Sequence, residues 1–137
     1  GGFVYLWSRY RCPNASCDPY VAEIEYTLLD RHGNIVREVG RLTDHSEATV
    51  HTYDFSPAVA VAPNGRIGVL WHRYLWNHST SQYNYNIHFA LLDGSGNVVY
   101  GPANLTNNDV NGGTSTCRAS TIRASRPATI IASSWPG

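Results

Sequence analysis

Aromatic and basic side chains gather in one stretch of the chain, WHRYLWNHST at 71–80. Its first four residues resemble WSRY at 7–10, whereas the earlier stretch has RCPNAS in the place of LWNHST. Aromatic rings exposed among Asn, Gln and Ser offer apolar faces and hydrogen-bonding groups together, which suits sugar rings or peptide segments. Ordinary loop packing is the alternative. We therefore expect a ligand-binding loop formed by Arg73, Trp76, His78, Tyr83 and Tyr85.

Acidic and histidine side chains gather in a second stretch, TDHSEATVHTYD at 43–54. A metal site or an acid–base pair would need such groups, here Asp44, His45, Glu47, His51 and Asp54. Their spacing matches no ligand signature, and the corresponding stretch after Thr106 contains no His. We therefore predict a solvated linker that holds no metal.

The remaining reactive groups favour turns over catalysis. DGSGN at 93–97 resembles the start of a calcium loop, but no bidentate Glu follows it, so we predict a hairpin turn. Cys117 lies in STCRAS, which lacks the context of a nucleophile elbow. The sequence therefore predicts no catalytic residue, no metal and no cofactor.

The spacing of Cys12 and Cys17 suits a disulfide across the mouth of a hairpin. Such a bond would fit an extracytoplasmic protein, secreted or at the cell surface, because disulfides persist in oxidising compartments. Three reduced thiols are the alternative.

Composition excludes several partners and favours strands. The 137 residues carry a formal net charge of +0 and only 15% are charged, so no basic patch predicts a nucleic-acid partner. No apolar run approaches the ~20 residues of a membrane-spanning helix. Gly, Asn, Ser and Thr are abundant and Lys is absent, which suits short strands with polar turns better than helices.

The chain contains an internal duplication. IEYTLLDRHGNIV at 24–36 aligns with IHFALLDGSGNVV at 87–99, an offset of 63 residues. FVYLWSRY at 3–10 aligns with IGVLWHRY at 67–74, an offset of 64 residues. Agreement over separate segments predicts two copies of one structural unit.

Each duplicated segment is typical of a β-strand. IGVLW is apolar on both faces, as in a strand covered on two sides, whereas AEIEYTLL at 22–29 alternates between a dry and a wetter face. PAVAVA at 57–62 matches PATIIA at 127–132, and Pro at the first position removes no interior ladder bond. DRHGN and DGSGN predict hairpin turns in which Gly adopts a positive φ.

These segments predict an all-β chain of two antiparallel four-stranded meanders arranged as β-propeller blades. With PAVAVA named strand A, the permuted strand order is BCD-ABCD-A. The repeats occupy about 1–54 and 55–118 of a single unit 1–137, and residues 119–137 supply an extra A-type strand. That spare strand can complete a neighbouring BCD sheet. A two-sheet β-sandwich is the alternative.

The pattern P-x-x-A-x-x-x-x-G-x-x-x-x-x-W, then I-x-x-x-x-L-D-x-x-G and a closing L-T, extends from Pro57 to Thr106. It resembles the repeats of secreted and surface bacterial β-propellers and, more loosely, TolB-like propellers. The Asp-box of sialidases, the WD dipeptide and the paired Gly of kelch repeats are missing. The shared residues are core and turn positions, so the resemblance implies a fold and no particular activity.

Two blades cannot close a ring, which usually takes about four to eight, so we expect self-association or further blades. The leading interpretation is a non-catalytic, extracytoplasmic module that acts as a scaffold or binds a ligand, such as a carbohydrate, through loops at the blade edge. One alternative is a fragment of a propeller hydrolase whose catalytic residues lie elsewhere. The other is a purely structural, self-assembling unit.

Overall fold

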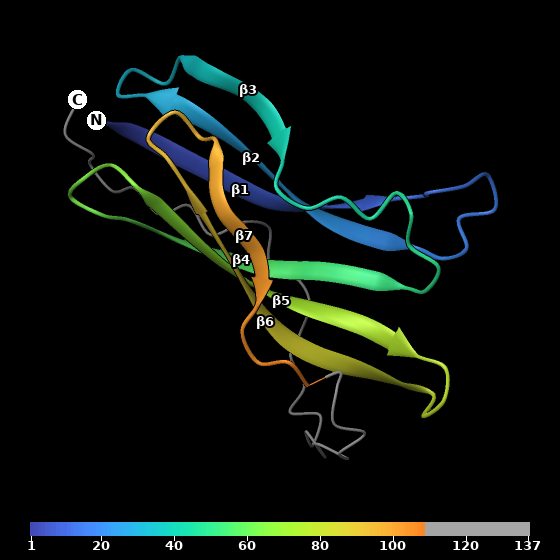
Figure 1. The fold of residues 1–137 in the computed structure, drawn as a ribbon. Helices are drawn as coiled ribbons and strands as arrows, with labels where there is room; N and C mark the ends of the chain where they lie inside the picture. The colour runs from blue at the N-terminus through green and yellow to red at the C-terminus, as the bar shows by residue number, and fades with distance from the viewer. Residues whose placement is uncertain (109–137) are drawn as a thin grey trace.

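The computed structural model describes residues 1–108, which form seven strands and no helix (Figure 1). The all-β prediction is confirmed for this part of the chain, where no helix could span a membrane. The predicted A-type strand at 127–132 and Cys117 lie outside the described residues. The strands are β1 (Gly2–Arg11), β2 (Val21–Asp30), β3 (Ile35–Arg41), β4 (Thr52–Val61), β5 (Ile67–Asn77), β6 (Gln82–Leu92) and β7 (Val98–Asn104).

The strands form one mixed sheet in the order β1-β2-β4-β5-β6-β7, with β3 paired to β2. Strands β1 to β3 pair antiparallel with one another, and β4 to β7 make an antiparallel meander. A short parallel pairing joins the two parts, with Val21 opposite Thr52 and Ala22 opposite Tyr53. The described strands therefore form one sheet, in which only these two residue pairs connect β1–β3 to β4–β7.

Two equivalent hairpin turns follow β2 and β6, as the sequence predicted. Asp30 and Asp93 each accept backbone hydrogen bonds of 2.8–2.9 Å from residues two and four positions later. Gly33 and Gly96 occupy the third position after the Asp with φ of 86° and 83°. Glycine reaches this region without a steric cost, so these residues close the turns.

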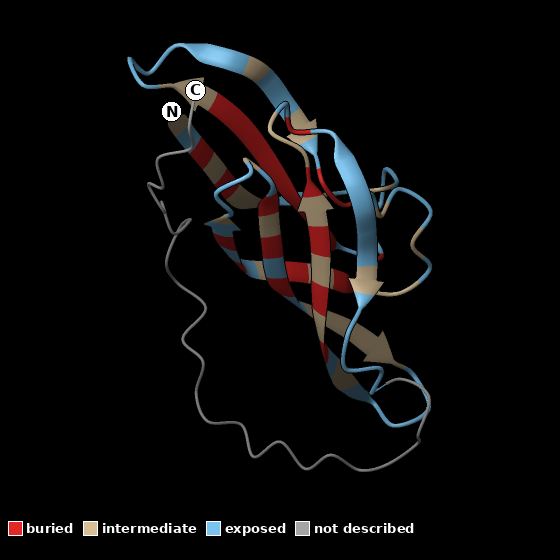
Figure 2. Cartoon of the chain, turned by 60° about the vertical axis from the view of Figure 1, so that its left-hand side comes forward, coloured by how far each residue is buried: buried red, intermediate tan, exposed pale blue. Residues whose placement is uncertain are grey.

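One face of β1–β3 is buried against one face of β4–β7. Figure 2 shows buried residues along the central strands, whereas β3 and β7 are largely exposed. The first repeat, with the segment after β3, contributes Val4, Leu6, Ile24, Tyr26, Leu28 and Leu42 to the core. The second repeat contributes Val59, Ile67, Val69, Trp71, Ala90 and Leu92.

The two repeats bury opposite faces. Leu6 is fully buried, whereas its equivalent Leu70 is exposed; Trp71 is fully buried, whereas its equivalent Trp7 is half-buried. Equivalent side chains therefore face the same direction, and the repeats pack head to tail.

Polar contacts fix the turn of the second repeat on the first. The hydroxyl of Tyr26 donates a 2.6 Å hydrogen bond to the carbonyl of Gly96. The guanidinium of Arg37 lies 5.3 Å from the centroid of the Tyr26 ring and donates to the carbonyl of Ser95 at 3.2 Å. The β6–β7 turn is thus part of the interface between the repeats.

Alanine at the two equivalent turn glycines is expected to give unequal losses of stability. A Cβ at Gly96 would lie 2.6 Å from Arg37 Cδ and 3.0 Å from Leu28 Cδ1, whereas one at Gly33 would meet nothing within 4 Å. We expect Gly33→Ala to lower the free energy of unfolding by about 1–2 kcal/mol, the cost of left-handed backbone. Gly96→Ala should cost clearly more, because buried Leu28 cannot move aside. Urea denaturation measures both, and equal losses would contradict the close packing of this turn.

Candidate functional site

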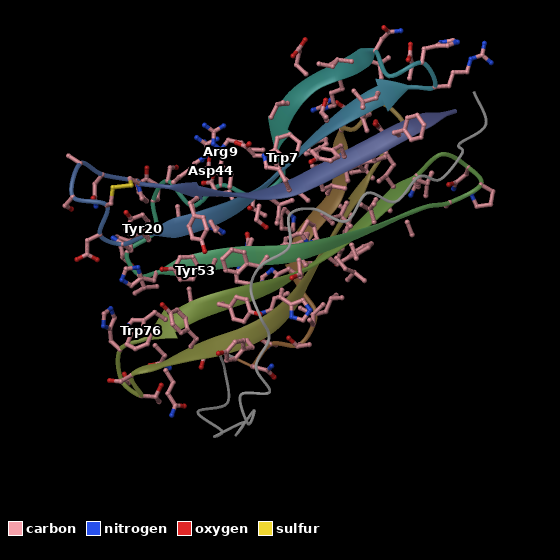
Figure 3. All side chains as sticks on the ribbon, turned by 180° about the vertical axis from the view of Figure 1, so that it is seen from behind. Trp7, Arg9, Tyr20, Asp44, Tyr53 and Trp76 are labelled. Carbon is pink, nitrogen blue, oxygen red and sulfur yellow. A yellow bond between two sulfur atoms is a disulfide. The ribbon has the colours of Figure 1, made fainter. Side chains whose placement is uncertain are left out.

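The residues predicted to bind a ligand lie mainly on two adjacent strands. Strands β5 and β6 pair along their whole lengths, so Trp76, Tyr83 and Tyr85 are strand residues and only His78 lies in the connecting turn. The prediction of a loop at the first three is therefore wrong. Figure 3 shows Trp76 at the end of the molecule that also carries Tyr20 and the disulfide.

Three of the predicted residues lie together at this end. Trp76 is directly opposite Tyr83, and their ring centroids are 4.9 Å apart in an edge-to-face arrangement. The Nε1–H of Trp76 donates to Nδ1 of exposed His78 at 3.3 Å. Aromatic pairs in this geometry hold each other's orientation, so Trp76 is positioned before any ligand arrives.

Tyrosines cross the sheet in a row on the same face. The register places Tyr10, Ala22, Tyr53, Tyr74 and Tyr85 opposite one another on β1, β2, β4, β5 and β6. Directly opposed residues share a face, and neighbouring strands are ~4.8 Å apart. The row therefore places four phenol rings on one face of the sheet, with Ala22 between Tyr10 and Tyr53.

Neighbouring rings join this row into one surface, which we call the aromatic strip. Phe55 packs 5.7 Å from both Tyr10 and Tyr53 and 5.8 Å from Tyr74. The ring of Tyr53 lies 5.9 Å from that of Tyr83, which connects the row to Trp76. The aromatic strip consists of Tyr10, Tyr53, Phe55, Tyr74, Trp76, Tyr83 and Tyr85.

The strip is open to solvent, and two of its hydroxyl groups, those of Tyr53 and Tyr74, stay neutral. Tyr10 is 62% exposed and Tyr85 is 44% exposed. Burial raises the pKa of Tyr53 to about 12, and the hydrogen bond to Tyr83 adds to the shift. Burial also raises the pKa of Tyr74. These hydroxyls therefore remain hydrogen-bond donors at every physiological pH.

Arg73 lies on the opposite face of the same strands, because side chains alternate along β5. Its Nε donates to Asp54 Oδ1 at 2.7 Å, and its second guanidinium contact to Oδ2 is 2.9 Å long. His45 Nε2 is 2.7 Å from Asp54 Oδ2. The structure thus separates Arg73 from the other predicted ligand-binding residues and places it in a buried polar cluster.

The prediction of a solvated linker is wrong for Asp54 and His45. Asp54 is fully buried and the His45 side chain is 10% exposed, because Arg73 directly opposite Asp54 requires a counter-ion inside the fold. Burial opposes ionisation of Asp54, but the hydrogen bonds from His45 and Arg73 outweigh it and lower its pKa to about 2. Asp44 and Glu47 are exposed, as predicted, and His51 is half-buried.

A hollow of about 360 Å³ lies beside this cluster. Its polar lining includes His45, Glu47, Arg73 and His88. Arg73 and His45 already contact Asp54, and within residues 1–108 no three metal-ligating side chains come together. We interpret the cluster as a structural element that fixes the linker to the sheet.

Two further carboxylates, Glu23 and Glu25, are buried on the outer face of β1–β3. Arg41 donates to Glu23 at 2.6 and 3.0 Å, Arg11 contacts both carboxylates, and Arg9 lies 3.6 Å from Glu25. The alternation along β2 predicted that this face is the wetter one. The two carboxylates are buried instead, because the arginine side chains cover them. Arg9 and Arg73, equivalent in the duplication, both pair with a carboxylate.

Cys12 and Cys17 form the disulfide that their spacing allowed. It closes the connection between β1 and β2, at the same end of the sheet as the β5–β6 turn (Figure 3).

Comparisons with protein-family models, curated proteins and solved structures found no match. The resemblance to propeller repeats therefore stays a prediction.

Sequence reasoning missed four members of the strip, Tyr10, Tyr53, Phe55 and Tyr74. Two of them carried a signal, because Tyr10 and Tyr74 end the duplicated W-x-R-Y motif. Alternation places that Tyr on the face opposite the Trp and Arg of the motif. The sequence could not show that Tyr53 and Phe55 lie beside Tyr10 and Tyr74, because this depends on the β2–β4 and β4–β5 registers.

Proposed function

We propose that this chain is a non-catalytic binding module whose aromatic strip holds an extended carbohydrate. The observation that carries the proposal is the row of tyrosines at one register across β1, β4, β5 and β6. An open, extended surface of this kind fits a chain molecule better than a compact ligand, which needs an enclosing pocket.

The chemistry of the strip supports a sugar ligand. Ring faces pack against the apolar faces of pyranose rings, and phenol hydroxyls of the strip exchange hydrogen bonds with sugar hydroxyls. Among the described residues, the basic side chains that stack on the strip are the imidazoles of His51, on Tyr53, and His72, on Tyr74, and no Arg side chain does so. A neutral polysaccharide is therefore the class of ligand that fits best.

We also propose that β1–β3 and β4–β7 are successive blades of a propeller. The duplicated strand order and the head-to-tail burial of equivalent faces support this arrangement. Within residues 1–108, β1 pairs only with β2, whereas its equivalent β5 pairs on both sides.

An extracytoplasmic location is part of the proposal. The Cys12–Cys17 disulfide supports it, because such bonds persist in oxidising compartments, where polysaccharides of cell surfaces and matrices are accessible.

Loss of the Trp76 ring is expected to weaken carbohydrate binding by about 30-fold, the usual effect of truncating a central aromatic contact. Affinity electrophoresis in gels containing neutral polysaccharides, chosen from a glycan array, measures the effect of Trp76→Ala and Tyr85→Ala. Tyr100→Ala is the matched control, because Tyr100 is exposed on β7 outside the strip. Binding that survives in Trp76→Ala would contradict the assignment.

An array without any bound glycan would refute the carbohydrate proposal. Proline-rich peptides also bind to exposed aromatic rings and are tested on a parallel array. Binding to peptides alone would show that the strip is a binding surface but that its ligand is a peptide and not a carbohydrate.

A further inference from the structure

The outer face of β4–β7 carries apolar residues whose equivalents in the duplication are buried in β1–β3. We call it the stacking face; it comprises Leu70, Ile87, Phe89 and Leu91. The equivalents in the first repeat are Leu6, Ile24, Tyr26 and Leu28, each at most 3% exposed. Leu70 is 42% exposed and the other three are half-buried, so the second repeat keeps apolar side chains at positions that the described residues do not cover.

Inside the chain, one face of the second repeat packs on the first repeat. The outer face of β1–β3 carries the duplicated equivalents of that packing face. The packing face on β5 and β6 includes Ile67, Val69, Trp71 and Leu92, each at most 1% exposed. Its equivalents in the first repeat, which we call the receiving face, are Phe3, Tyr5, Trp7 and Leu29. These residues are apolar or aromatic and partly exposed, with Phe3 at 37%.

We infer that a second copy of this chain packs its receiving face on the stacking face. The interface between the two repeats is the template, because each residue of the new interface has a buried equivalent in the internal one. Both halves of this interface are present on every copy, and apolar patches of this kind mark association surfaces. The occupant that fits is therefore the chain itself.

The polar groups nearby are compatible with this packing. Glu25 lies on the same face as Trp7 and already accepts a 3.0 Å hydrogen bond from its Nε1–H. Arg9 and Arg11 contact the same carboxylate. Association would thus bury no unpaired charge, which is the main cost of covering ionisable groups.

The contact is heterologous, because the two faces are different surfaces of one chain. Heterologous contacts generate a ring if the rotation closes and an open row if it does not. Such an assembly leaves the end of the aromatic strip at Tyr83 accessible but covers Tyr85, whose equivalent Ala22 is fully buried. Tyr20, the equivalent of Tyr83, is 46% exposed although the second repeat covers the first.

Analytical ultracentrifugation of the 137-residue chain over a concentration series tests the inference. We expect the wild type to form assemblies larger than a dimer. Leu70→Glu, which places a charge on the stacking face, and Phe3→Glu, which places one on the receiving face, should each sediment as monomers. Val98→Glu is the matched control, because Val98 is also 42% exposed but lies opposite Leu92, away from the stacking face.

Mixing the two monomeric variants distinguishes this contact from any symmetric one. The free receiving face of Leu70→Glu and the free stacking face of Phe3→Glu should combine to a one-to-one heterodimer that grows no further. The heterodimer also proves that both variants are folded. A monomeric wild type, unchanged assembly of Leu70→Glu, or no heterodimer would each overturn the inference. None of these outcomes changes carbohydrate binding by the isolated chain, so the two proposals fail separately.

Discussion

Replacing Asp54 by Asn is expected to lower the free energy of unfolding by about 3–5 kcal/mol, the usual cost of removing one partner of a buried ion pair. Asp54 is fully buried and holds Arg73 through two short contacts and His45 through a third. The variant leaves the Arg73 guanidinium, itself only 20% exposed, without its carboxylate. Urea denaturation followed by tryptophan fluorescence measures the loss.

Asp44→Asn provides the matched control in the same linker. The Asp44 side chain is 59% exposed and pairs with Arg41 at the surface, where ion pairs contribute little. Its stability should stay close to that of the wild type. An Asp54→Asn variant as stable as Asp44→Asn would contradict the structural role of the cluster.

The same carboxylate predicts part of the acid sensitivity of the fold. The pKa of Asp54 is about 2 in the folded chain, below its ordinary value of 3.8. Its contribution to stability is therefore complete above the ordinary value and is lost as the pH falls from about 4 towards 2. The stability of the wild type should fall more steeply over this window than that of Asp54→Asn.

Truncation of Trp71 to Ala is expected to cost about 3–5 kcal/mol, because it opens a large cavity in a closed core. Trp71 is 1% exposed and packs between the two repeats. Its equivalent Trp7 is half-buried on the outer face, so Trp7→Ala should cost clearly less. Urea denaturation of both variants compares them, and Trp71→Phe serves if the Ala variant does not fold. Equal losses would contradict the head-to-tail packing.

The strands were predictable because apolar alternation and turn residues act locally. Each predicted strand within residues 1–108 is present, and the Asp–Gly–Asn turns close as expected. The order of the strands along the chain was predictable from the internal duplication, because two copies of one sequence pattern fold alike. The parallel contact of Val21 and Ala22 with β4 was not predictable, since it depends on how the linker returns to the sheet.

The candidate site was predictable only in part. The sequence indicated Trp76, Tyr83 and Tyr85 through their aromatic density, and the strands bring them onto one face. Arg73 was wrongly grouped with them, because the alternation along β5 decides the face and the pairing with Asp54 is a long-range contact. Tyr53 entered the strip through register alone, which local patterns do not encode.

The most direct test of carbohydrate binding by the aromatic strip is NMR of the tryptophan indole N–H groups during titration with soluble neutral oligosaccharides. The Trp76 signal, assigned through Trp76→Phe, should shift in a saturable manner, because its ring lies in the strip beside Tyr83. The signals of buried Trp71 and of Trp7, whose Nε1–H is bonded to Glu25, should stay in place. A saturable shift of Trp7 or Trp71 with Trp76 unchanged, or no shift with any oligosaccharide, would contradict the proposed function.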